Sequence, residues 1–166
     1  MKLFSLPFLL LSRLVWPFEF LSGVDCVLPK YFSVCSEVDF QVYLAAEEVF
    51  ADLRAANLAV FFNYRGATSG ELCSRDNVHF GTMYLDRQDT NILVANELVW
   101  TPTTLYNVLL HESLHSLGLD HAYDKQGVMN YAVTLDQEGN VVDDSTKLWP
   151  SFDDLSGVYT KCFLTY

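Results

Sequence analysis

Apolar residues recur at helical spacing along residues 36–56. An apolar stripe with this period predicts an amphipathic helix whose apolar face packs on a sheet. Ser36, followed by Asp39 three residues later, matches a helix N-cap pattern and predicts that the helix begins there. The positions that form the stripe are Val42, Ala45, Ala46, Val49, Leu53 and Ala56.

Three shorter stretches predict β-strands. Residues 58–64 form an almost unbroken apolar and aromatic run that is too short for another helix. Residues 78–86 and 91–95 carry the next two strand patterns, and the polar residues 87–90 join them as a turn. The first half of the chain therefore combines one helix with several strands.

A second long helix is predicted after these strands. Thr101 is a suitable N-cap residue, and Pro102 suits the first helical position because that position needs no backbone N–H. The helix is expected to end near Gly118. Its apolar positions are Leu105, Val108, Leu109 and Leu114.

The last part of the chain predicts a loop and then a closing helix. Residues 135–147 are mostly polar and contain a glycine turn, which indicates a loop. Residues 151–161 form the helix pattern, with Ser151 as the cap and Asp154 at the third helical position.

Composition and charge restrict the domain count and the partners. The chain has 166 residues, of which 51% are apolar and 14% aromatic, and this is enough for one packed domain. The formal net charge is -11. Nucleic acid is excluded as a partner because its phosphates require a basic face, and anionic membrane surfaces are disfavoured for the same reason.

The first residues resemble an export signal. Lys2 precedes a mostly apolar stretch at 3–11, and Ser22 and Gly23 are small residues that suit cleavage. The apolar stretch is shorter than the ~20 residues of a membrane-spanning helix. We therefore predict a signal peptide at 1–23, a mature domain at 24–166, secretion to the extracellular space, and no stable membrane anchor. An amphipathic or buried N-terminal segment is the alternative.

Four cysteines form an even set in a chain predicted to be exported, which favours two disulfides. Three pairings are compatible with the sequence, which does not select among them, and buried free thiols are the alternative if the chain is not exported. The four residues are Cys26, Cys35, Cys73 and Cys162.

The strongest chemical signal is the segment at residues 111–121. His111 and His115 lie four residues apart, so on a helix both imidazoles project from one face toward one cation. Gly118 can adopt the left-handed conformation that ends a helix and turns the chain. His121 then approaches the same ion from another side. Solvated histidines on a helix face would not explain the glycine at this spacing.

Three neutral imidazoles leave a fourth tetrahedral position open for water, as in catalytic zinc sites. We predict one catalytic Zn²⁺ held by His111, His115 and His121. Zinc lowers the pKa of its water to about 7. Glu112, beside the ligands, is the predicted general base for hydrolysis of peptide bonds by the zinc-activated water.

At these residues the sequence resembles the metzincin metallopeptidases, whose motif is HExxHxxGxxH. Residues 127–131 resemble the Met-turn of that group, in which Met129 lies beneath the imidazoles. Within the metzincins, residues 105–121 and 152–157 are most similar to matrixin catalytic domains.

The resemblance implies the fold and the substrate. It implies a metzincin-like α/β (α+β) zincin domain with a small twisted mixed sheet, two long helices and a short C-terminal helical subdomain. The implied activity is that of a monomeric zinc metalloendopeptidase acting on extracellular proteins. Its protein or peptide substrate would bind in extended conformation along the strand at 78–86, the edge of the sheet. Residues 131–133 and the region of Val108 would line the pocket that sets preference.

Several residues depart from the matrixin pattern. His79 resembles a ligand of a second, structural zinc, but no further histidine remains to complete that site, so we predict its absence. Tyr131 fits the astacin and serralysin pattern, in which a tyrosine supports the zinc site or the oxyanion, and a role in the pocket wall is the alternative. Residues 26–29 faintly resemble the inhibitory cysteine segment, but a disulfide role for Cys26 is favoured.

Two features of the prediction stay open. Acidic residues between Asp136 and Asp144 suit Ca²⁺, although an acidic loop in solvent is the commoner arrangement. Two other functions compete with the endopeptidase: a protease-like domain that only binds a partner, and a zinc hydrolase acting on a small peptide or an amide-linked cell-wall component. Retention of Glu112 argues against the first, and an open-ended cleft would argue against the second.

Overall fold

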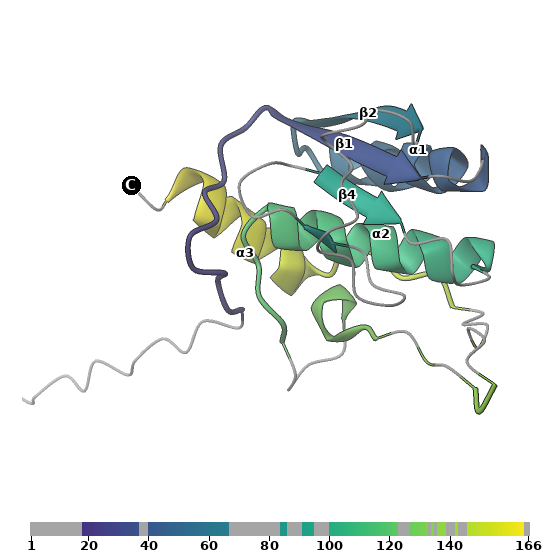
Figure 1. The fold of residues 1–166 in the computed structure, drawn as a ribbon. Helices are drawn as coiled ribbons and strands as arrows, with labels where there is room; N and C mark the ends of the chain where they lie inside the picture. The colour runs from purple at the N-terminus through teal and green to yellow at the C-terminus, as the bar shows by residue number, and fades with distance from the viewer. Residues whose placement is uncertain are drawn as a thin grey trace, which may run out of the picture.

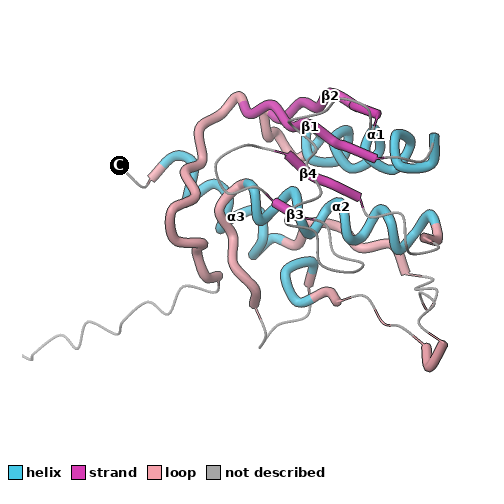
Figure 2. Tube along the Cα trace, viewed as in Figure 1, coloured by secondary structure: helices cyan, strands magenta, loops and turns pink. Residues whose placement is uncertain are grey.

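The computed structural model places a small sheet against two long helices (Figures 1 and 2). The longest helix of the first half, α1 (Phe40–Ala55), contacts α2 (Pro102–Ser116), and both pack on the same sheet. The structure describes residues 18–36, 40–66, 84–85, 91–94, 100–122, 127–132, 134, 136–138, 142 and 146–164.

The sheet is mixed and has the strand order β2-β1-β4-β3. Its parallel part consists of β1 (Lys30–Ser36), β2 (Val60–Gly66) and β4 (Asn91–Val94). The two-residue β3 (Tyr84–Leu85) runs antiparallel to β4 and forms the edge among the described strands. The central strand, β1, was not predicted from the sequence.

One face of the sheet is covered by the helices. Side chains of β1 and β2 alternate, so that Phe32 and Val60 are buried while Tyr31 and Phe61 are exposed on the other face. Phe50 of α1 fills the interface, with its ring 4.8 Å from the Phe32 ring. This interface is the main hydrophobic core.

The start of α1 corrects one prediction. Ser36 is the last residue of β1, and the helix begins at Phe40, so Ser36 is not its N-cap. Pairing of Ser36 with Gly66 and Val94 in neighbouring strands outweighs the local capping signal. The predicted apolar face is confirmed, since Val42, Ala46, Val49 and Leu53 are buried, and only Ala56 at its end is half-buried.

The later helices begin where the sequence predicted. Thr101 caps α2 by accepting a hydrogen bond from the Thr104 backbone, and Pro102 is its first residue. At α3 (Phe152–Phe163), Ser151 and Asp154 form a reciprocal capping box. The predicted α/β (α+β) class, with a mixed sheet, two long helices and a C-terminal helix, is confirmed.

The N-terminal segment also joins the domain. Phe20 pairs with Leu119 in an antiparallel bridge, and the Leu21 amide donates to the Gly118 carbonyl at 2.9 Å. A disulfide between Cys26 and Cys162 selects one of the pairings left open by the sequence. The side chains of the other two cysteines lie outside the described part of the chain. Most of the predicted strand at 78–86 also lies outside it.

Among the described residues, no helix has the length and apolar character needed to cross a membrane. The predicted signal peptide lies mostly before residue 18, and its cleavage after Gly23 stays a prediction. Cleavage there would remove the pairing of Phe20 and Leu21 with the turn that follows α2.

Candidate metal centre

The helix α2 carries the first two ligands in a buried position. His111 and His115 lie one turn apart near its C-terminus and are only 5% and 8% exposed. The helix is buried almost all round, because the sheet, α1 and η2 (Val128–Asn130) contact it on different sides. Two largely buried imidazoles are thereby held on one face of the helix.

The turn after α2 brings in the third ligand. Gly118 has φ of +95°, a conformation that L-residues rarely adopt, and its amide donates to the His115 carbonyl at 2.9 Å. The chain reverses there, and His121 returns to the C-terminal part of α2. Its side chain remains 39% exposed, so the site opens to solvent on this side.

The three imidazoles converge on one point. The Nε2 atom of His121 lies 3.3 Å from Nε2 of His111 and 3.3 Å from Nε2 of His115. All three candidate ligand atoms lie within 4.8 Å of one another. Two nitrogen ligands of a tetrahedral zinc ion, each about 2.0–2.1 Å from the metal, are about 3.3–3.4 Å apart. The donor set and its spacing therefore fit zinc.

Backbone carbonyls fix how two of the rings are oriented. His111 Nδ1–H donates to the Val128 carbonyl at 2.7 Å, and His115 Nδ1–H donates to the Leu119 carbonyl at 2.7 Å. In both rings this leaves the Nε2 lone pair facing the centre, as a metal ligand requires. Sequence reasoning missed these two carbonyls, since a carbonyl belongs to every residue and has no residue-type signal.

Burial sets the charge of the groups around the centre. Burial and the neighbouring His115 imidazole lower the pKa of His111 to about 4. Burial lowers the pKa of His115 as well. The two rings are therefore neutral at physiological pH and ready to bind a cation. In the metal-free protein, burial raises the pKa of Glu112 to about 8.

The predicted Met-turn follows the third ligand. Met129 in η2 is buried, and its carbonyl accepts a hydrogen bond from the Ala122 amide at 3.1 Å. Tyr131, directly after η2, packs partly buried against the core. Its two predicted roles, at the metal centre or in the pocket wall, stay predictions.

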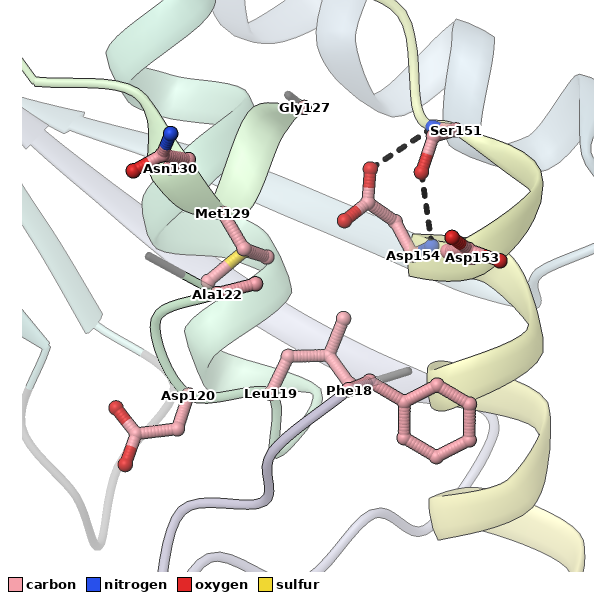
Figure 3. A pocket seen from close by; sticks show the side chains of 10 residues that line it. All are labelled: Phe18, Leu119, Asp120, Ala122, Gly127, Met129, Asn130, Ser151, Asp153 and Asp154. Carbon is pink, nitrogen blue, oxygen red and sulfur yellow. Dashed lines mark hydrogen bonds between the residues drawn. The ribbon is translucent and has the colours of Figure 1, made fainter. Parts of the chain in front are cut away.

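A small pocket of about 20 Å³ lies behind the metal-binding turn (Figure 3). It separates Met129 and Ala122 on one side from the start of α3 on the other, where Ser151 and Asp154 are hydrogen-bonded to each other. Phe18 closes its lower end. None of the three histidines is among the residues that line this pocket, which lies between the turn and α3.

Other predicted sites fall largely outside the described residues. His79 is not described, so the predicted absence of a second zinc stays a prediction. The Glu138 amide donates to the Asp136 carboxylate, and calcium binding by this acidic stretch is untested. Among the described residues, the three histidines are the one group of at least three His, Cys, Asp or Glu with converging ligand atoms.

The comparison with protein families gives one match. A family model described as Matrixin matches residues 24–157, which include α2, the turn after it and all four described strands. A comparison with curated proteins found no match.

Proposed function

Because the chain belongs to the matrixin family and is a zinc metalloendopeptidase, we propose that it is secreted and hydrolyses internal peptide bonds with a zinc-activated water. The observation that carries this proposal is the convergence of three imidazoles within the matched region, where Nε2 of His121 lies 3.3 Å from Nε2 of His111 and 3.3 Å from Nε2 of His115. Its substrates are peptides or proteins.

The metal would be held by His111, His115 and His121. Bound there, zinc supplies Lewis acidity that lowers the pKa of a water to about 7, and positive charge that favours ionised Glu112. Hydrogen bonds from the two Nδ1 atoms to backbone carbonyls keep His111 and His115 in the tautomer that binds. The protein therefore provides a preformed site.

Glu112 is the proposed general base. It is the next residue after His111 on α2, and it is partly buried. Its carboxylate takes the proton of the attacking water and passes that proton to the leaving amine. Tyr131 is a candidate to stabilise the developing oxyanion, or else to line the pocket.

The substrate is proposed to bind in extended conformation. β3 is the edge of the sheet among the described strands, and an edge strand offers unpaired backbone groups to a peptide. Residues 131–133 and the region of Val108 are proposed to line the pocket that sets preference. The disulfide between Cys26 and Cys162 supports the proposal of secretion, because disulfides persist in oxidising environments outside the cell.

Cleavage of a quenched fluorescent peptide library tests the proposal. Turnover by the wild-type chain should stop with a zinc chelator and return with added zinc. The Glu112→Gln variant should bind zinc but lose activity by about 10²–10⁴-fold, because general bases contribute that much. Bound zinc without turnover in the wild type would support a binding domain instead.

A further inference from the structure

An acidic residue lies directly before the third metal ligand. His111 and His115 donate from Nδ1 to neutral backbone carbonyls, at 2.7 Å in each case. Near the Nδ1 atom of His121 lies a charged group, the carboxylate of Asp120, whose Oδ1 is 3.8 Å away. This distance is longer than a hydrogen bond and within the range of an ion pair. Asp120 thereby brings negative charge to the metal centre.

A single oxygen of Asp120 faces both the backbone and the ring of His121. Oδ1 accepts a hydrogen bond from the His121 amide at 2.8 Å, and the same atom is the one near Nδ1 of the ring. Attraction to this oxygen turns the Nδ1 edge of the ring toward its own backbone. The Nε2 atom then faces the other two imidazoles, 3.3 Å from the Nε2 atom of each.

The backbone of Asp120 is held from two sides. Its amide donates to the Glu19 carbonyl at 2.9 Å, and the amide of the preceding Leu119 donates to the Leu114 carbonyl of α2 at 3.2 Å. The side chain is 39% exposed, and Figure 3 shows its carboxylate pointing away from α3. The position of the carboxylate therefore follows from the turn that carries the third ligand.

A carboxylate beside a ligating imidazole favours a bound cation in two ways. It makes the imidazole more basic, and its own charge attracts the cation. Replacement of such groups typically weakens metal binding by about 10–100-fold. Because Asp120 is partly exposed, water screens its charge, and we expect removal of the charge alone to give the lower end of this range.

We propose that Asp120 is a positioning residue of the metal centre, whose carboxylate orients His121 and strengthens the binding of zinc. The inference deepens the function proposed above, because it concerns the same site. Asp120 acts through His121 and has no assigned contact with the substrate. Its effect is therefore measured on metal binding, independently of turnover.

The test measures zinc affinity by competition with a chelator, in the full chain and in three variants. Asp120→Asn removes the charge and keeps an oxygen that accepts from the His121 amide, whereas Asp120→Ala removes both. The control, Asp153→Asn, removes the same charge from α3, across the pocket from Asp120 (Figure 3). The absorption spectrum of each chain loaded with cobalt instead of zinc reports the ligand geometry.

The D120N variant should bind zinc about tenfold more weakly than the wild type, and D120A about 10–100-fold more weakly. The cobalt spectrum should change more in D120A than in D120N, because only D120A loses the oxygen that orients the ring. The D153N control should bind zinc as the wild type does. If D120A does not fold in the absence of metal, D120N carries the test.

Two results would overturn the inference. The first is a wild-type zinc affinity in folded D120N and D120A. The second is an equal loss of affinity in D153N, which would show a general effect of charge rather than a role of this carboxylate. Absence of turnover in the zinc-loaded wild type would overturn the proposed endopeptidase instead, and the zinc affinities would still decide the role of Asp120.

Discussion

Two of the metal ligands lie on a buried helix, and the third lies on a partly exposed turn. His111 and His115 are placed by helical spacing alone, within α2, which is packed on nearly every side. His121 depends instead on contacts from distant parts of the chain, including the N-terminal segment, η2 and α3. The helix half of the site should therefore resist changes that disturb the turn half.

Removal of the disulfide should have the largest effect on the turn. The Cys26–Cys162 bond closes a loop between residues 136 positions apart, which ties the N-terminal segment to α3. Replacing both cysteines by serine should lower the free energy of unfolding by about 2–5 kcal/mol. Denaturant titration measures this loss. A change below about 0.5 kcal/mol would show that the N-terminal segment is held by other contacts.

A shorter N-terminus should have the next largest effect. A chain that begins at Val24 lacks the bonds from Leu21 to Gly118 and from Asp120 to Glu19. Loss of these two bonds and of the Phe20 packing should cost about 1–3 kcal/mol and weaken zinc binding by about tenfold. Zinc titration and thermal unfolding compare it with a chain that begins at Phe18. Equal zinc affinity would contradict a role of this segment in placing His121.

Substitution of Gly118 should have a smaller effect. Its φ of +95° strains any L-residue, and an added Cβ would lie 2.8 Å from the flexible Lys161 side chain, which can move. Gly118→Ala should therefore cost about 1–2 kcal/mol. Denaturant unfolding measures this, with the exposed Gly23→Ala at φ +76° as a control that has backbone strain but no contact. Equal losses of stability in both variants would show that backbone strain alone accounts for the effect of Gly118→Ala, with no contribution from the Lys161 contact.

The helix half is best probed by pH in the metal-free protein. The pKa of His111 is about 4 in the folded protein, below its ordinary value of 6.5. Between pH 4 and pH 6.5 the unfolded chain therefore binds more protons than the folded chain. Stability is therefore lost as pH falls from about 6.5 to about 4. The raised pKa of Glu112, about 8 against an ordinary value of 4.5, has the opposite effect on stability. The stabilisation that it contributes is lost as pH rises from about 4.5 to about 8.

Glu112→Gln separates these two effects. With a chelator present, the melting temperature of the variant relative to the wild type should rise between about pH 5 and pH 8. The loss of stability at acid pH, which comes from His111, should remain in the variant. A relative melting temperature that does not change with pH would contradict the buried environment of Glu112.

The sequence predicted the part of the site that follows from local spacing. The helix with Thr101 and Pro102, the turn at Gly118 and the three ligands all agree with the structure. The unpredicted parts are long-range. The seven residues of strand β1 show no clear alternation of apolar and polar residue types. Its place inside the sheet depends on pairing with β2 and β4.

Long-range hydrogen bonds explain the other omissions. Asn107 binds residues about 40 positions later, and no sequence pattern indicates which backbone a buried amide will meet. The bridge between Phe20 and Leu119 is of the same kind, because Phe20 lies within the stretch predicted as a signal peptide. Local periodicity carries no information about such pairs.

X-ray absorption of the zinc-loaded chain tests the three-histidine centre most directly. The geometry predicts one zinc per chain with three imidazole nitrogens and one oxygen at about 2.0–2.1 Å. In His121→Ala the imidazole count should fall to two and the affinity should drop sharply. Sulfur in the coordination shell, or an unchanged spectrum in His121→Ala, would contradict the account.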